Sequence, residues 1–179
     1  MNFRMLRVKD LKGAIALDMP YKGERLSMIF LLPDPNHSSL EDLEEAMSKV
    51  TDLNSILKFG KKVKVQVTLP CFKLESQFEL VEPLKQLGMT DMFDERKADF
   101  SGMTGGTNKG LFVSQVVQKA FVEVNEDGAE AAAATVGIVM LRAMPMNPEF
   151  TCDRPFMFLI RDNLTRMILF SGHVTDPSK

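Results

Sequence analysis

The chain is poor in the residues that build metal and catalytic centres. Its 179 residues include two cysteines, Cys71 and Cys152, and two histidines, His37 and His173. So few thiols and imidazoles leave almost no material for a metal cluster, and no metal or cofactor is expected. Each cysteine lies in an apolar, strand-like stretch, which favours a buried free thiol over a disulfide bridge.

Long apolar runs and a strong charge of one sign are also lacking. No run approaches the roughly 20 apolar residues of a membrane-spanning helix, and no signal peptide is visible at the start. The formal net charge is only -2, which argues against general binding to nucleic acid. The short basic cluster of Lys61, Lys62 and Lys64 is interpreted as a solvated strand edge.

No pattern of residues points to turnover catalysis. Ser171 and His173 lie two residues apart on a strand-like segment, but the sequence shows no carboxylate that would complete a triad. His37 lies in a polar turn. Residues 102–110 contain glycines without the spacing of a phosphate-binding loop, and the acidic run 41–45 is typical of a solvated helix face. We therefore expect that the protein is not an enzyme.

What the chain does contain is a mixture of strands and short helices. Strands are expected at 5–8, 14–21, 25–33, 63–69, 72–78 and 111–128, followed by an edge strand near 150–152 and a hairpin whose turn lies near Asp162 and Asn163. Short helices are expected at 39–50, at 51–59 and within 80–89. Ser38 or Ser39 can cap the first, and the other two are stopped by Gly60 and Gly88. Antiparallel strands with segregated short helices indicate an α+β fold.

Several of the expected strands are almost wholly apolar. The segments "MIFLLP", "FMFLI" and "MILF" have no polar alternation, which predicts burial on both faces. Few elements in the chain could cover both faces, so the sequence reads as part of a larger fold.

The most unusual segment is "EDGAEAAAATVGIVMLRA", residues 126–143. Its alanines favour a helix, whereas the β-branched residues after them favour a strand or a loop. Taken alone, an alanine-rich helix or a surface loop would explain it. However, the segment resembles the hinge of inhibitory serpins, the serine protease inhibitor superfamily. The matching positions are Glu126, Asp127, Gly128, Ala129, Glu130, Ala131, Ala132, Ala133, Ala134 and Thr135.

A second motif supports this resemblance. The serpin signature near the C-terminus is matched by Phe150, Asp153, Arg154, Pro155 and Phe156, and five upstream segments fall in serpin order. The resemblance covers about the C-terminal half of a serpin. It implies a partial serpin domain over residues 1–179, made mostly of antiparallel sheets with short helices, in which the N-terminal half is missing. Residues 126–149 would form the hinge and reactive-centre loop.

The resemblance implies inhibition of a serine-type endopeptidase by a suicide mechanism. The target protease would cleave the loop as an acyl-enzyme, and the cleaved loop would insert into a sheet and stall deacylation. Insertion requires small side chains at alternate positions, and Ala129, Ala131, Ala133 and Thr135 satisfy this. Because residues 111–128 supply only one strand beside the gap, we expect the chain alone to be cleaved as a substrate.

The usual length of the serpin loop places the scissile bond at Arg142–Ala143, which suits a trypsin-like serine protease as partner. A different register would use Met140, Leu141 or Met144 and favour a chymotrypsin-like protease. Two further readings remain open: a non-inhibitory serpin (carrier, chaperone or storage protein), and a non-functional truncated fragment.

The resemblance also carries expectations about location and modification. It implies a secreted, extracellular glycoprotein, and the sequons at Asn36 and Asn163 are candidate N-glycosylation sites. No nucleic-acid or membrane partner is expected, and a glycosaminoglycan partner is left undetermined. Two positions depart from the usual serpin pattern: Ala129 stands where Thr or Ser is common, and Gln118 where many serpins have His.

Overall fold

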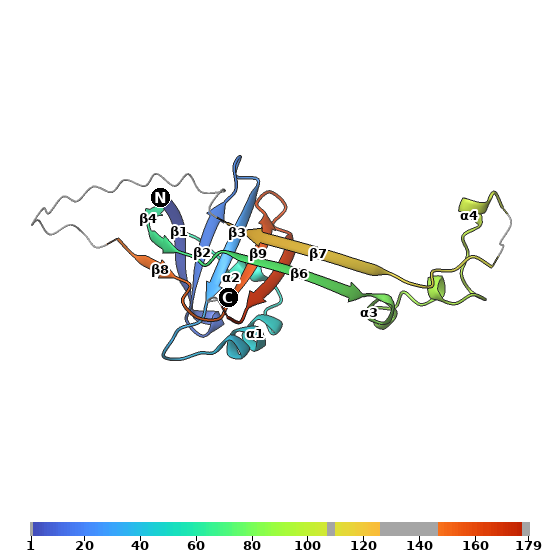
Figure 1. Ribbon diagram of the computed structural model, residues 1–179, viewed down its shortest axis with the longest axis horizontal. Coiled ribbons are helices and arrows are strands. Elements are labelled where there is room, and N and C mark those ends of the chain that lie inside the picture. Colours follow the sequence, from blue (N-terminus) through green and yellow to red (C-terminus); the bar gives the residue numbers. More distant parts are fainter. Residues whose placement is uncertain (1, 107–109, 126–146, 177–179) are drawn as a thin grey trace, which may run out of the picture. The chain divides into compact units, whose positions relative to one another are not determined.

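The computed structural model describes residues 2–106, 110–125 and 147–176. The chain divides into two compact units, which are described separately. The larger unit consists of Met1–Phe72 and Glu126–Lys179, and the smaller one of Lys73–Asn125. The described residues of both units are rich in strands and have only short helices (Figure 1), so the predicted α+β class is confirmed.

The larger unit is built on a six-stranded sheet. Its strands are β1 (Asn2–Val8), β2 (Ala14–Pro20), β3 (Leu26–Leu32), β4 (Val63–Lys64), β9 (Phe156–Asp162) and β10 (Ile168–Val174). They follow the order β10-β9-β3-β2-β1-β4, and every neighbouring pair is antiparallel. The turn between β2 and β3 contains Gly23 at φ 85°, where a residue without Cβ is favoured. The expected N-terminal strands and C-terminal hairpin are therefore present.

Helices cover one face of this sheet. They are the 3-10 helix η1 (Lys9–Leu11), α1 (Leu40–Ser48) and α2 (Leu53–Ile56). Ser39 caps α1: its hydroxyl accepts from the Asp42 amide, and the Asp42 carboxylate accepts from the Ser39 amide. The helices pack on a buried cluster made of Val8, Leu11, Ala14, Ala16, Ile29, Leu31, Leu43, Leu57 and Leu159. The helix predicted at 51–59 is shorter than expected, because α2 ends at Ile56.

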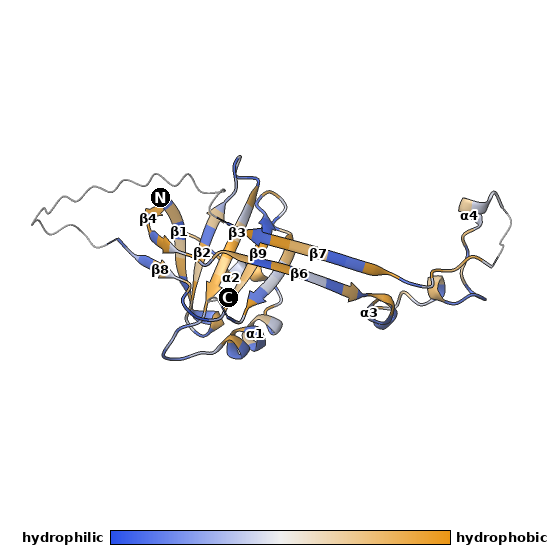
Figure 2. Ribbon diagram, in the orientation of Figure 1, coloured by the Kyte–Doolittle hydropathy of each residue, from blue (hydrophilic) through white to orange (hydrophobic). Residues whose placement is uncertain are grey.

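The opposite face of the sheet carries a group of packed phenylalanines. The Phe156 ring lies 5.9 Å from that of Phe30 and 5.8 Å from that of Phe72, and the Phe72 ring lies 5.6 Å from that of Phe158. Strands β3 and β9 are therefore apolar on both faces, as Figure 2 shows by their mostly orange colour. The prediction that these strands are buried on both faces is confirmed for β3 and for most residues of β9. It fails for β10, where Leu169 and Phe170 are exposed.

A second, two-stranded sheet joins distant parts of the sequence. Strands β5 (Gln66–Thr68) and β8 (Glu149–Thr151) pair in parallel, with Val67 opposite Phe150. The prediction of a single strand over residues 63–69 is thus wrong, because β4 pairs with β1 while β5 pairs with β8. Val65, between the two, is buried. Apolar and polar residues do alternate over this segment, but its first half pairs with one strand and its second half with another.

The smaller unit contains a second strand pair and short helices. Its elements are β6 (Phe72–Glu79, whose first residue belongs to the larger unit), α3 (Val81–Gln86), the 3-10 helix η2 (Asp91–Phe93), α4 (Ser101–Thr104) and β7 (Val117–Val124). The strand predicted at 111–128 is shorter than expected at its start, since β7 begins at Val117; residues 126–128 lie outside the described ranges. Among the described hydrophobic residues of this unit, only Ala98 is buried. No helix in the described parts of the chain is long and apolar enough to cross a membrane.

Candidate functional site

The predicted hinge, Glu126–Thr135, and the predicted scissile bond, Arg142–Ala143, lie outside the described residues. The structure does describe the strands on either side of this segment in the sequence. Strand β7 ends at Val124, just before the hinge, and β8 begins at Glu149, just after the loop. These two strands are therefore the described parts of the candidate site.

The start of β7 is held by a carboxylate at the end of β6. Glu79 accepts hydrogen bonds from the Gln115 side-chain amide (2.9 Å) and from the Val116 backbone amide (3.2 Å). The Leu80 amide donates to the Val116 carbonyl at 2.8 Å. The bond from Gln115, which favours the ionised carboxylate, lowers the pKa of Glu79. The chain is thus fixed directly before β7, the strand that leads to the hinge.

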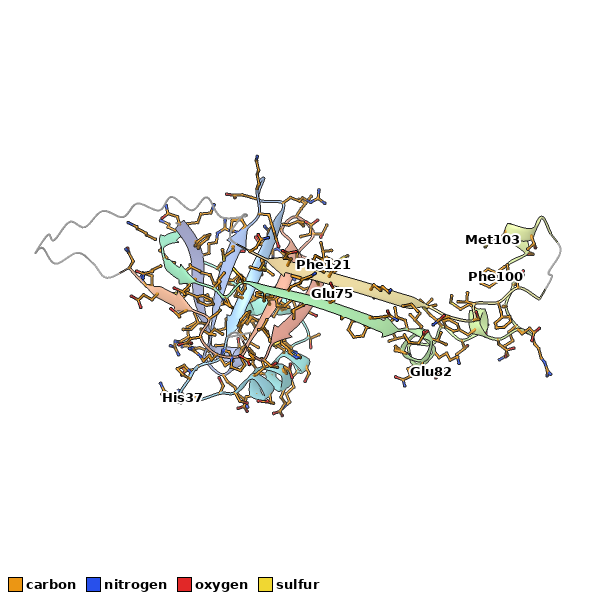
Figure 3. All side chains as sticks on the ribbon, viewed as in Figure 1. His37, Glu75, Glu82, Phe100, Met103 and Phe121 are labelled. Atoms are coloured by element: carbon orange, nitrogen blue, oxygen red, sulfur yellow. The ribbon has the colours of Figure 1, made fainter. Side chains whose placement is uncertain are left out.

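Beyond its start, β7 is open. Within the described residues it pairs only with β6. Phe121, labelled in Figure 3, is 52% exposed, and the Lys73 ammonium lies 5.2 Å from its ring centroid. Gln118, which stands where many serpins have His, is exposed on this strand. The other edge of β7 therefore offers backbone groups with which an added strand could pair.

Downstream of the loop, the chain is bound firmly to the larger unit. The Gln66 amide donates to the Pro148 carbonyl at 3.0 Å, and the Cys152 amide donates to the Thr68 carbonyl at 3.0 Å. These bonds bracket the parallel pairing of β5 with β8. Glu149, which was predicted to close the loop, is already the first residue of β8. The loop therefore ends, on this side, at Pro148.

The predicted family-signature residues have structural roles. Phe150 and Phe156 are buried, and Phe156 packs against Phe30 and Phe72. The Arg154 guanidinium donates from Nε to the Pro33 carbonyl at 3.1 Å and pairs with Asp153 at 2.8 Å. Pro155 stands directly before β9. The signature thus joins β8 and β9 to the chain that follows β3.

The two candidate glycosylation sites differ in their surroundings. Asn36 is exposed, in the loop before α1. The amide nitrogen of Asn163, by contrast, donates to the Glu24 carbonyl at 2.9 Å and to the Ser27 hydroxyl at 2.7 Å, and its oxygen accepts from Arg161. A glycan on this nitrogen would break these bonds, so the geometry disfavours modification at Asn163.

The histidine and cysteine expectations need corrections. The sequence showed no carboxylate near Ser171 and His173, but His173 Nδ1 lies 2.9 Å from the Glu44 carboxylate of α1. This contact joins the helix to β10, and no sequence motif signals it. Both cysteines are free, as expected; Cys152 is buried, but Cys71 is exposed. Among the described residues, no group of three or more His, Cys, Asp or Glu side chains could hold a metal ion.

Comparisons with known proteins identify relatives along almost the whole chain. The family model "Serpin (serine protease inhibitor)" matches residues 1–177. Human leukocyte elastase inhibitor is 42% identical over 95% of this chain, and human serpin B8 is 47% identical over 90% of it. A solved structure of protease nexin-1 with heparin superposes with a TM-score of 0.71 at 35% identity and covers 98% of this chain.

The location of these relatives contradicts the expectation of secretion. Leukocyte elastase inhibitor and serpin B8 are intracellular serpins of clade B that lack signal peptides. The expectation of a secreted, extracellular protein is therefore wrong, because it was taken from the superfamily as a whole rather than from relatives such as these. The relatives also give no support to the expectation of a glycoprotein.

The match covers only part of each relative. The chain spans 45% of the length of human leukocyte elastase inhibitor, 42% of human serpin B8 and 44% of the protease nexin-1 chain. These relatives are protease inhibitors rather than enzymes. The family model covers nearly every residue of this chain, and the structural neighbours share its fold. The chain belongs to the serpin family.

Proposed function

We propose that this chain carries the reactive-centre half of a serine protease inhibitor and supplies the bait that the protease attacks. The main support is the hinge sequence at residues 126–135, which directly follows β7. In non-inhibitory serpins this hinge typically contains bulky or charged residues, whereas here its residues at alternate positions are small and uncharged. That difference favours an inhibitor over a carrier, chaperone or storage protein.

The proposed chemistry begins with the protease. Its catalytic serine attacks the carbonyl carbon of residue 142, the peptide bond to Ala143 breaks, and an acyl-enzyme forms. The freed segment then adds to a sheet as a new strand. The open edge of β7 supports this step, because a strand added there would continue the chain that leaves β7 at Val124.

Arg142 is proposed as the specificity residue. A guanidinium forms a bidentate, charge-assisted pair with the carboxylate in a trypsin-like pocket, which an apolar side chain cannot do. The names of relatives point to a second candidate, since one of them is an elastase inhibitor. Cleavage beside Met140, Leu141 or Met144 would correspond to an apolar pocket of that kind.

The 179-residue chain by itself is proposed to be a substrate rather than a trap. Trapping requires the cleaved segment to be held between two strands. Within the described residues, β7 has β6 on one side and no partner on the other. An inserted segment would have one neighbour only, so the acyl-enzyme would be hydrolysed before the protease could be distorted.

The experiment is limited proteolysis with trypsin, chymotrypsin and leukocyte elastase in parallel. Mass spectrometry locates the first bond cut, and a denaturing gel detects covalent complexes. Trypsin should cut first at Arg142–Ala143; R142K should preserve this cut, and R142L should abolish it. First cleavage by trypsin at another bond would refute Arg142 as the specificity residue. A covalent, SDS-stable complex with the protease would refute the proposal that the chain alone is only a substrate.

A further inference from the structure

A cavity of about 440 Å³ opens on the larger unit, away from the strands described above as the candidate site. Its lining comes from β1, the β2–β3 region, the segment around α2 and the turn between β9 and β10. Four of the lining side chains are cationic, Arg4, Lys58, Arg161 and Arg166, and one is a carboxylate, Glu24. This volume is within the range of small-molecule sites in proteins.

Most of this positive charge is not neutralised. Arg4 pairs with Asp18 at 3.0 Å, and the Glu24 carboxylate is occupied by Lys62 at 2.6 Å. By contrast, no ion pair involves Lys58, Arg161 or Arg166 among the residues that the structure describes. The cavity therefore presents two guanidiniums and one ammonium that lack an anionic partner.

The guanidinium of Arg161 is held in place and electrostatically crowded. Its Nε and Nη2 both donate to the Asn163 side-chain oxygen, at 3.4 and 3.2 Å. Burial lowers the pKa of Arg161; Asp18 acts in the opposite direction, and the charges of Arg166 and Arg4 lower it further. The positive charges of Arg166 and Arg4 thus repel that of Arg161, and a bound anion would relieve this repulsion.

An unsatisfied acceptor lies in the same lining. The side-chain nitrogen of Asn54 donates to the Arg166 carbonyl at 3.2 Å. Its side-chain oxygen is buried and has no hydrogen-bond partner among the described residues. A buried polar atom without a partner is costly, and a ligand hydroxyl would remove that cost by donating to it. A ligand that carries both an anionic group and a hydroxyl would therefore complement the groups that line this cavity.

We propose that this cavity binds a small organic phosphate that also carries hydroxyl groups. The planar guanidiniums of Arg161 and Arg166 match phosphate oxygens in bidentate geometry, and Lys58 adds a point charge. A hydroxyl donates to the Asn54 oxygen. Leu57 and Phe59, also in the lining, provide apolar contact for the carbon skeleton. The same headgroup chemistry occurs in free sugar or inositol phosphates and in phosphoinositide lipids.

Isothermal titration calorimetry with inositol trisphosphate tests this site. We expect saturable binding of one molecule per chain, weakened about tenfold in R166Q and in K58Q, because each variant removes one charged contact. Both side chains are at the cavity, and neither is in the buried core. The matched control is K9Q, which removes the same charge from an exposed residue of the same unit that does not line the cavity.

Four further titrations, with neutral inositol, inorganic phosphate, lipid vesicles and heparin, define the ligand. Neutral inositol should not bind, and inorganic phosphate should bind at least tenfold more weakly, since it has no carbon skeleton or separate hydroxyl. Binding to phosphatidylcholine vesicles that contain phosphatidylinositol bisphosphate, without binding of free inositol trisphosphate, would support the site and assign the lipid as its source. Equal affinity of R166Q and the unmodified chain, equal binding of inorganic phosphate, or tighter and arginine-dependent binding of heparin would each overturn the proposal.

Discussion

The ring of Phe158 occupies the space in which residue 172 would need a side chain. A Cβ built on Gly172 would lie 2.7 Å from Phe158 Cζ and 2.9 Å from Cε1. The two residues are directly opposed on β9 and β10. The phenylalanine packing on this face of the sheet thus depends on a glycine in the neighbouring strand, because only glycine leaves room for the ring.

Replacing this glycine should destabilise the larger unit. G172A forces the Phe158 ring away from the Phe72 ring, and we expect a loss of about 1–3 kcal/mol in the free energy of unfolding, as for overpacked cores. Urea unfolding followed by circular dichroism measures it. G60A is the matched control, since a Cβ at Gly60 would meet no atom of the described residues within 4 Å. The decrease in the urea midpoint should be smaller in the double variant G172A/F158L, because leucine leaves more room for the new methyl group. Equal urea midpoints for G172A and G60A would contradict the packing argument.

Asp34 should make the stability of the chain depend on pH in the acid range. Its carboxylate accepts from the Asn36 amide at 3.0 Å, from Arg7, and lies 3.3 Å from His37 Nδ1. The bond from the Asn36 amide is the largest cause that lowers the pKa of Asp34 to about 2, from an ordinary 3.8. A depressed folded-state pKa gives stability that is fully present above the unfolded-state pKa of about 3.9 and is lost as the pH falls toward the folded-state value.

D34N removes this titration. We expect it to lower stability at neutral pH and to flatten the fall in stability between about pH 4 and pH 2. Some slope will remain, since the pKa of Asp42 is also lowered to about 2, chiefly by its bond with Lys12. Urea unfolding at a series of pH values measures the slope, with D10N at an exposed position as control. A slope in D34N as steep as in the unmodified chain would rule out this role.

Thiol labelling should separate the two cysteines. Cys71 is exposed, whereas burial raises the pKa of Cys152 to about 12 and keeps it a protonated thiol. Ellman's reagent at pH 8 should therefore modify about one thiol per folded chain, and two after denaturation. C71S should give no rapid reaction when folded, and C152S should react like the unmodified chain. Rapid modification of two thiols in the folded chain would refute the burial of Cys152.

Features set by neighbouring residues were predictable from the sequence. The cap of α1 depends on Ser39 and Asp42, three residues apart, and the burial of β3 depends on its own apolar run. The choice of strand partners was not predictable in this way. Nothing in the alternation of Val63, Val65 and Val67 reveals that β4 pairs with β1 while β5 pairs with β8, because that choice depends on distant segments.

The same distinction applies to the functional residues. The hinge and Arg142 came from a contiguous motif and its resemblance to a family. The contact between His173 and Glu44, and the grouping of Lys58, Arg161 and Arg166 around one cavity, involve side chains from separate elements. Such groupings exist only after folding, so no local pattern in the sequence could indicate them.

The last prediction concerns the strand that leads to the hinge. Glu79 accepts from Gln115 and from the Val116 amide, so E79A should release the start of β7. The loss of one charge-assisted backbone bond corresponds to about a tenfold increase in hydrogen exchange at the Val116 amide. Exchange measured by NMR or mass spectrometry checks it. E82A is the control: among the described residues, Glu82, labelled in Figure 3, has an exposed pair with Lys85 on α3 as its one ion pair. If hydrogen exchange at residues 115–119 rises equally in both variants, Glu79 does not hold the start of β7 in place. If exchange rises in E79A alone, the rates of trypsin cleavage at Arg142 can be compared in the two variants. That comparison asks whether the start of β7 affects how the reactive-centre loop is presented to the protease.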